Sequence, residues 1–585
     1  MNAAGYARKS PRRPLLFAHR FADGKASRGD AKVPLSLRLP HFPTLSERED
    51  TSPGFVSSSI ALQTVKYLPS CTAPARLSKP RRHSHGFASS STALQAAKRP
   101  VPFCCAPHDS PSRKELLRLR LPHPPLLSGP RSAMPRVLCG SNDQKRTVTA
   151  MNVREIAYLT LLRAASAEQY SNLALDSAIR KYHLTGADRA FFTQLIYGTI
   201  EREISLDWYI RCFSSVKQEK IEPGVMILLR MGIFQLLFLD RIPDSAAVNE
   251  TVSLAKTHLH KGVSGFINAV LRSIARSKSS LPMPEEGTAE YRSVRYSCPV
   301  WLCRLWADSY GEERAERLLA ETLKHPLPTL RVNTLRITRR DLLAQLQAEG
   351  VACTPTQSSE NGIQLSENLP ISEFNALQNG LCFIQDEASQ LCAEALQAEP
   401  GLRVLDACAC PGGKSFSCAI SMENRGTVIA ADLHESKLSL VERGAARLGI
   451  TSLTAAVQDA SKLREEWISS FDRVLCDVPC SGLGVLAKKP DLRRKKPEDI
   501  ARLPELQYKI LCRNAEYVKP GGLLVYSTCT LHPAENEENT ARFLREHPDF
   551  VPCADRMPKA LASVTLFPDE FGTDGFFLAK FTRIR

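Results

Sequence analysis

Two cysteines that follow predicted strands are the strongest candidates for chemistry in this sequence of 585 residues. Cys480 stands in the stretch DVPCSG, after strand formers at 473–476, and Cys529 stands in STCT, after strand formers at 523–526. A single buried cysteine is usually a small, inert apolar side chain. Two cysteines at equivalent strand ends, with Asp477 close to one of them, are instead typical of a reactive pair in which a thiolate is the nucleophile.

Aspartate ends four of the predicted strands, where an open α/β sheet binds its ligands. These residues are Asp406, Asp432, Asp459 and Asp477. One aspartate at a strand end can simply cap the next helix. Four of them in successive strand–helix units indicate a bound cofactor at the carboxyl edge of the sheet.

A glycine-containing loop follows the first of these strands, and its uncovered backbone would let a ligand approach closely. It consists of Cys408, Ala409, Cys410, Pro411, Gly412, Gly413 and Lys414. The loop has neither the GxGxxG pattern of dinucleotide sites nor the P-loop pattern of triphosphate sites. Asp432, at the end of the second strand, is well placed to hold ribose hydroxyls. S-adenosylmethionine, a nucleoside cofactor that is not a dinucleotide, fits this pattern; a tight strand–helix turn is the alternative.

The elements that position these residues are strands that alternate with helices from about residue 400. This alternation predicts a parallel, doubly wound α/β domain at 396–585. Its strands are expected at 403–405, 427–431, 453–457, 473–476 and 523–526.

Two smaller domains are expected in front of this sheet. Residues 151–285 show a helical period and predict an all-helical domain of roughly 130 residues, the size of one compact domain. Its helices are expected near 153–164, 173–181, 188–201, 205–213, 223–240, 246–256 and 265–277. Residues 286–395 combine helical stretches with strand formers at 328–337, which predicts a small α+β subdomain.

The first 150 residues differ in composition from the rest of the chain. They hold 25 of the 77 Lys and Arg residues but 8 of the 61 Asp and Glu residues, so 52 basic and 53 acidic residues remain. They are rich in Pro and Ser without a sustained period, so we expect residues 1–150 to be disordered. Such a leader is typical of an organelle transit peptide, or of sequence that is not natively coding and precedes a start at Met134 or Met151. The net charge of +16 is therefore no evidence that the folded part binds nucleic acid.

Composition also argues against several classes of protein. The sequence has no apolar run of about 18 residues, so we expect no membrane helix and no membrane partner. The 18 cysteines have neither the spacing of a disulfide framework nor that of a zinc site, so no metal is expected. Many free thiols in a long chain are typical of a reducing compartment, which predicts a cytoplasmic protein.

The sequence resembles the NOL1/NOP2/Sun family of RNA cytosine-C5 methyltransferases over about residues 290–585. The resemblance rests on the CxCPGGK loop, on DxPCSG and on STCT, together with further motifs in the same order. These are Arg331-Val332-Asn333, QDEASQ at 385–390, Lys489-Pro490-Asp491, Glu535-Asn536-Glu537 and TDGFF at 573–577. Residues 151–280 resemble NusB, an RNA-binding antitermination fold. The combination is similar to the Sun/Fmu branch of the family, which modifies 16S rRNA in bacteria.

The resemblance implies a Rossmann-like, S-adenosylmethionine-dependent methyltransferase domain behind a NusB-like RNA-binding domain and a small RNA-binding subdomain. The cofactor contacts it implies are the loop 408–414, Asp432, Asp459 and Asp477. The expected activity is methylation of a 16S rRNA cytosine at C5 during ribosome maturation. We expect the enzyme to be a monomer.

The resemblance also implies that Cys529 is the nucleophile that adds to C6 of the base. We expect Cys480 to assist the later elimination and Asp477 to contact the base. The sequence departs from the family at Cys410, where alanine is usual, and at Arg494, where an aromatic residue is common. The second departure leaves one RNA contact in doubt.

Basic side chains supply candidate contacts to RNA phosphates. The candidates are Arg331, Arg339, Arg340, Lys488, Lys489 and the run 493–496. Runs of charge are usually solvated faces, so each of these assignments has a simpler alternative.

Other functions remain open at this stage. A member of the same family could act on tRNA or on another rRNA site. A protein of a different class, a non-enzymatic NusB-like antitermination factor, could carry a vestigial methyltransferase fold. The presence of both cysteines, of Asp477 and of the glycine loop favours an enzyme.

Overall fold

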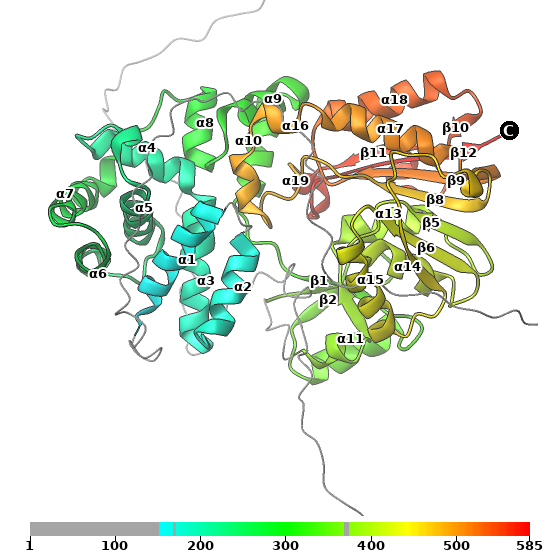
Figure 1. Cartoon of the computed structure of the whole chain (residues 1–585), viewed down its shortest axis with the longest axis horizontal. Coiled ribbons are helices and arrows are strands. Elements are labelled where there is room, and N and C mark those ends of the chain that lie inside the picture. The colour runs from blue at the N-terminus through cyan, green and yellow to red at the C-terminus, as the bar shows by residue number, and fades with distance from the viewer. Residues whose placement is uncertain (1–150, 168–170, 368–373) are drawn as a thin grey trace, which may run out of the picture. The chain divides into compact units, whose positions relative to one another are not determined.

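The computed structural model describes residues 151–167, 171–367 and 374–585 (Figure 1). The predicted disordered leader, 1–150, lies outside the described residues. Across the described residues, no helix is long and apolar enough to cross a membrane.

Seven helices form the first domain, in agreement with the helical period of the sequence. They are α1 (Val153–Ala167), α2 (Ser171–Lys181), α3 (Gly186–Glu201), α4 (Glu203–Phe213), α5 (Pro223–Phe238), α6 (Asp244–His258) and α7 (Val263–Arg276). Helix α5 is apolar nearly all round, and 12 of its 16 residues are buried, so it is the central helix of this core. Gly198 of α3 lies so close to the Phe234 ring that a Cβ there would be 1.9 Å from the ring.

The region that follows contains three helices and then a small antiparallel sheet that carries two further helices. The helices are α8 (Ala289–Tyr296), α9 (Val300–Tyr310) and α10 (Glu312–Glu321), and the strands are β1 (Thr329–Val332), β2 (Cys353–Pro355), β3 (Gly362–Leu365) and β4 (Cys382–Ile384). The sheet order is β2-β3-β1-β4, and its helices are α11 (Arg339–Ala348) and α12 (Asn375–Gln378). The strand formers at 328–337 supply β1, whose four residues are all buried. Strand β2 has three residues, two of them exposed, and therefore carries almost no pattern.

A larger, mixed sheet forms the C-terminal domain. Its parallel strands are β5 (Arg403–Asp406), β6 (Thr427–Asp432), β7 (Leu453–Val457), β8 (Phe471–Asp477) and β9 (Val518–Thr528). Its antiparallel strands are β10 (Phe550–Pro552), β11 (Ser563–Leu566) and β12 (Phe576–Arg583), and the order is β10-β12-β9-β8-β5-β6-β7, with β11 paired to β12. The five parallel strands were predicted. The antiparallel edge was not, because strand–helix alternation ends after β9.

Helices cover both faces of this sheet (Figure 1). One face carries α13 (Glu387–Ala395), α14 (Gly413–Ser421) and α15 (Glu435–Leu448), and the other carries α17 (Leu503–Ala515) and α18 (Glu537–Glu546). The remaining short helices are α16 (Pro497–Ile500) and α19 (Pro568–Phe571). Because side chains alternate along a strand, Val404 joins the first core and Leu405 joins the second. Each large aliphatic side chain buried here contributes about 1.5–3 kcal/mol.

The strand order fixes where a ligand can bind. From β5 the chain continues to β6 and β7 on one side of the sheet, then returns to β8 and β9 on the other side. The crevice of a doubly wound sheet lies at such a reversal, outside the carboxyl ends of the two central strands. Asp406 ends β5 and Asp477 ends β8, so both lie at this point.

Candidate active site

A pocket of about 240 Å³ lies at this reversal. Seven of the predicted site residues line it: Ala409, Cys410, Pro411, Gly413, Lys414, Asp477 and Cys529. Five do not, namely Cys408, Gly412, Asp432, Asp459 and Cys480. The pocket also has a wall that the sequence did not predict, and Asp386, Asp574 and Phe576 belong to it.

The glycine loop connects β5 to α14. Gly412 is the N-cap of α14 with φ of 112°, a conformation that L side chains rarely adopt. A Cβ at Gly412 would also lie 2.5 Å from the Phe416 ring. The loop is fastened to the second strand by the backbone N–H of Ala409, which donates to the carbonyl of Ala431 at 2.8 Å. Glycine at 412 is therefore required by the turn itself.

Asp432 and Asp459 lie further along the same edge, at the ends of β6 and β7. Asp432 accepts backbone N–H groups of Cys410 and His434 at 3.3 and 3.0 Å. Asp459 accepts the N–H and hydroxyl of Ser461 at 3.0 and 2.7 Å. Both carboxylates thus order the local backbone, and their remaining lone pairs are available to ligands. Their cofactor contacts stay a prediction.

The two cysteines lie together over the ends of β8 and β9. Asp477 pairs with Ser527 in the parallel register, so the loops that follow start side by side. The sulfur atoms of Cys480 and Cys529 are 3.1 Å apart. A hydrogen bond from Cys480 lowers the pKa of Cys529, although burial works against this. The same hydrogen bond and burial raise the pKa of Cys480, so these directions favour Cys529 over Cys480 as the thiolate.

A buried polar network behind the cysteines holds both loops. Glu535, fully buried, accepts the backbone N–H of Ser481 at 2.9 Å and the side-chain amide of Gln507 at 2.7 Å. Asn536 accepts the Thr528 hydroxyl at 2.6 Å and donates to the carbonyl of Thr530 at 2.9 Å, so it brackets Cys529. In the sequence, Glu535 and Asn536 belong to a family motif to which no role was assigned. Their contacts show that they fix the backbone on both sides of the thiols.

Asp477 is held in place at the bottom of the pocket. Its Oδ2 forms an ion pair with Lys414 Nζ at 2.7 Å, and its Oδ1 accepts the hydroxyl of Ser527 at 2.8 Å. Burial disfavours the charge on Lys414, but Asp477 outweighs it and raises the pKa of Lys414. Lys414 therefore remains a cation beside the cysteines, with its side chain only 11% exposed.

Asp406 provides the test of whether the pocket fits the expected cofactor. The side chain is buried, and Oδ2 accepts the Ser415 hydroxyl at 2.6 Å, whereas Oδ1 has no partner. Burial raises the pKa of Asp406 to about 6. A buried acceptor without a donor, facing a pocket, fits a cationic group such as the ammonium of S-adenosylmethionine. The sequence identified Asp406 at a strand end but did not include it among the binding residues.

The unpredicted wall is fastened by a buried ion triad. Lys488 Nζ lies 2.6 Å from Asp386 Oδ2 and 2.8 Å from Asp574 Oδ2. Burial and Asp386 raise the pKa of Asp574 to about 7. The triad joins the segment before α13, the loop after Cys480 and the segment before β12. No single stretch of sequence reveals it, because its members are 86 or more residues apart.

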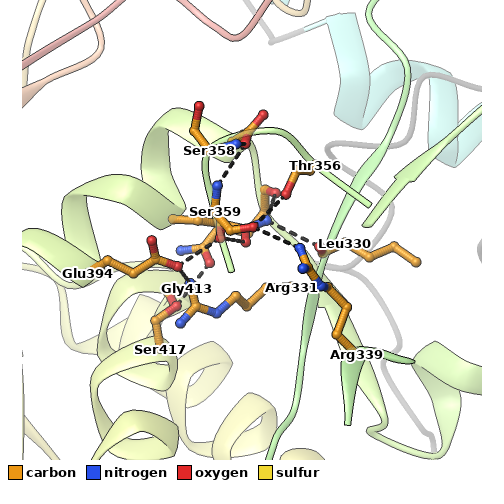
Figure 2. A network of polar contacts seen from close by, with 12 residues as sticks. Leu330, Arg331, Arg339, Thr356, Ser358, Ser359, Glu394, Gly413 and Ser417 are labelled. Carbon is orange, nitrogen blue, oxygen red and sulfur yellow. Dashed lines mark hydrogen bonds and ion pairs between the residues drawn. The ribbon is translucent and has the colours of Figure 1, made fainter. Parts of the chain in front are cut away.

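Three of the basic side chains expected to contact phosphates point inward instead, so those predictions are wrong. Arg331 is 2% exposed and donates to Glu394 Oε1 at 2.5 Å (Figure 2). Arg493 is 4% exposed and donates to the Thr322 carbonyl at 2.7 Å. Lys488 belongs to the ion triad. The physical reason is that arginine and lysine can enter a core when acceptors there pair with the charged group, and a charge pattern in sequence does not show the partner.

The other basic candidates differ among themselves. Arg494 pairs with Glu203 at 2.6 Å, and Lys495 donates to the carbonyl of Ser481 at 2.7 Å. Arg340 and Lys489 are exposed and stay candidates for RNA contact. Across residues 151–167, 171–367 and 374–585, no group of His, Cys, Asp or Glu could hold a metal ion.

Comparison with known proteins agrees with the three folded parts. Residues 393–582 match the family model described as 16S rRNA methyltransferase RsmB/F. Residues 151–276 match the NusB family, and residues 298–372 match the ferredoxin-like domain of RsmF/B-like methyltransferases.

Similar proteins extend over most of the chain. The probable ribosomal RNA small subunit methyltransferase B of Bacillus subtilis is 41% identical over 440 residues, covering 73% of this chain and 98% of that protein. The ribosomal RNA small subunit methyltransferase B of Klebsiella pneumoniae is 32% identical over 438 residues, covering 74% and 99%. The crystal structure of PH0851 has a TM-score of 0.65 at 26% identity and covers 74% of this chain and 99% of that one.

These matches confirm the resemblance seen in the motifs and the predicted order of domains. They also confirm S-adenosylmethionine as the methyl donor. The chain belongs to the ribosomal RNA small subunit methyltransferase B family, with a NusB domain and a ferredoxin-like subdomain in front of the methyltransferase domain.

Proposed function

We propose that this protein transfers a methyl group from S-adenosylmethionine to C5 of a cytosine in 16S rRNA through a transient bond between Cys529 and C6. The observation that carries the proposal is the pair of sulfur atoms 3.1 Å apart, beside Asp477 and Lys414. The choice of 16S rRNA follows from the names of the family model and the relatives. A cytoplasmic monomer acting during ribosome maturation fits this role.

The reaction needs a thiolate because C5 of cytosine is a poor nucleophile. When Cys529 Sγ bonds to C6, the electrons of the C5–C6 double bond become available at C5. S-adenosylmethionine supplies an electrophilic methyl group. Transfer leaves S-adenosylhomocysteine. The proton on C5 then passes to water, the C5–C6 double bond returns, and the bond between C6 and Sγ breaks to release the Cys529 thiolate.

Each neighbouring residue has a separate task. Cys480 donates its S–H toward Cys529, which stabilises the thiolate both before attack and when it leaves. Asp477 hydrogen-bonds the base at N3 and at the exocyclic amine. Lys414 supplies the positive charge that balances the negative charge developing on the base.

The target base must reach this buried site, so it is unpaired or flipped out of its stack. The NusB-like helices supply RNA affinity and the choice of site, because no residue of α1–α7 lines the pocket. A non-enzymatic antitermination factor is disfavoured. A protein that only binds RNA has no need for two thiols in contact, Cys480 and Cys529, of which Cys529 has a lowered pKa.

The proposal is tested by locating the transferred methyl group. Full-length protein is incubated with methyl-labelled S-adenosylmethionine and unmethylated 16S rRNA, the RNA is digested, and nucleosides are separated by mass spectrometry. The expected product is 5-methylcytidine at one site, and none with Cys529→Ala. Methyl groups on N4 or on a ribose oxygen, or undiminished transfer by Cys529→Ala, would contradict the proposal.

A further inference from the structure

A buried side-chain amide in the pocket lacks one hydrogen-bond partner. Gln385 is 6% exposed and lines the pocket at the segment before α13. Its backbone N–H donates to Thr329 at 2.9 Å, and its carbonyl accepts Gln390 Nε2 at 3.0 Å. Its side-chain Oε1 accepts the Ser417 hydroxyl at 2.9 Å, whereas Nε2 is buried without an acceptor. Buried donors in native proteins are nearly always paired, so Nε2 indicates a ligand atom that accepts.

The surrounding network fixes the position of the Gln385 backbone and side chain. Ser359 Oγ lies 2.8 Å from Gln390 Oε1 and 2.7 Å from Glu394 Oε1 and shares its one proton between them, and Arg331 donates to the same carboxylate (Figure 2). Ser417 Oγ likewise shares its one proton between Gln385 Oε1 at 2.9 Å and the carbonyl oxygen of Gly413 at 3.1 Å. The buried Arg331 and the partly buried Glu394 thus support a pocket wall.

Gln385 Nε2 faces the start of α14. It lies 3.6 Å from the position that a Cβ on Gly413 would occupy. Gly413 is the first residue of this nine-residue helix, and its first backbone N–H groups have no acceptor within the helix. Helix N-termini favour anions, so two kinds of donor converge on one place that suits a carboxylate.

The same pocket has the complementary group. Asp406 Oδ1, buried and without a donor, suits an ammonium. An unpaired donor and an unpaired acceptor on one pocket match the two ends of an α-amino acid, which S-adenosylmethionine carries on its methionine moiety.

We propose that Gln385 is a cofactor-binding residue whose Nε2 donates a hydrogen bond to the methionine carboxylate, while Asp406 accepts from the ammonium. The segment between β4 of the small sheet and α13 therefore completes the cofactor site. The inference rests on the cofactor of the proposed function but not on its cytosine chemistry.

The test uses three ligands that differ only at the amino-acid end. S-adenosylhomocysteine carries both charged groups, its decarboxylated analogue keeps the amine, and 5′-methylthioadenosine has neither. Calorimetry with the full chain measures each Kd without RNA. Gln385→Glu, which preserves shape, and Gln385→Met, which adds no charge, should weaken S-adenosylhomocysteine at least about tenfold, the loss of one hydrogen bond to a charged group. Both should leave the other two ligands within about twofold.

Asp406→Asn is the matched comparison. It should weaken S-adenosylhomocysteine and the decarboxylated analogue, but not 5′-methylthioadenosine. If both Gln385 variants weaken all three ligands equally, Gln385 has only a structural role. If the affinity for S-adenosylhomocysteine is unchanged, the amide does not contact the carboxylate. Either outcome overturns the proposal. A failure of the C5 chemistry would leave this pattern of affinities intact, so the two proposals fail separately.

Discussion

The carboxyl edge of the large sheet and the NusB-like helices are built on different principles. The edge contains paired thiols, a buried ion pair and two buried polar atoms without partners, Asp406 Oδ1 and Gln385 Nε2. The helical domain has a continuous apolar core around α5, and none of its residues lines the pocket. Buried polar groups left unsatisfied cost stability, and a ligand in the pocket can complete these two. The unpaired Arg189 Nε and Thr199 Oγ1 of the helical domain lie outside the pocket. The contrast separates the part proposed to perform chemistry from the part proposed to select RNA.

Removing the helical domain should have the largest effect on the natural substrate. A chain that starts at residue 286 should methylate 16S rRNA with kcat/KM lowered about 100-fold or more, because linked binding modules raise effective affinity by such factors. Its Kd for S-adenosylhomocysteine should stay within about twofold. Thermal unfolding with and without ligand checks that the fragment is folded. If the folded fragment methylates 16S rRNA with an unchanged kcat/KM, the helical domain has no part in substrate recognition and the prediction is wrong.

A substitution at Asp432, on the carboxyl edge of the large sheet, should weaken cofactor binding and leave RNA binding almost unchanged. Asp432→Ala removes a carboxylate expected to hold ribose hydroxyls, so cofactor binding should weaken by about 1.5–3 kcal/mol. RNA binding in the absence of cofactor should barely change, as measured by filter binding. Equal losses in both assays would mean that Asp432 only orders the backbone of Cys410 and His434.

The pH dependence should reveal the contact between the thiols. Because the pKa of Cys529 is lowered chiefly by Cys480, the thiolate persists at a lower pH than for an ordinary cysteine. Without that donor the pKa rises, so Cys480→Ala should move the acid limb of single-turnover methyl transfer to higher pH. Cys480→Ser, whose hydroxyl still donates, should move it less. An acid limb that stays in place in both variants would show that the sulfur contact does not tune Cys529.

Residues 1–150 should have the smallest effect. Their composition cannot bury enough apolar surface to offset chain entropy, and none of the motifs lies in them. A chain that starts at Met151 should fold and methylate as the full chain does. Insolubility of this chain, or a tenfold loss of cofactor affinity, would assign the leader to the folded protein.

A feature could be predicted from the sequence when a short stretch of chain determines it, and not when it depends on contacts between distant segments. Cys480, Cys529 and Asp477 were placed correctly, because the ends of parallel strands meet at one edge and short-range patterns identify strand ends. The Asp386–Lys488–Asp574 triad and the role of Gln385 were missed, because each depends on contacts between distant segments. Arg331 and Arg493 were misjudged for the same reason, since their partners are set by tertiary structure.

The most direct measurement is the covalent protein–RNA adduct formed with 16S rRNA and S-adenosylmethionine. Cys480→Ala should add to the base and transfer the methyl group but release it poorly, so a denaturation-resistant band that disappears with RNase should accumulate. Cys529→Ala and the double variant should give no adduct, because addition precedes elimination. An adduct from Cys529→Ala and none from Cys480→Ala would make Cys480 the nucleophile and contradict the account.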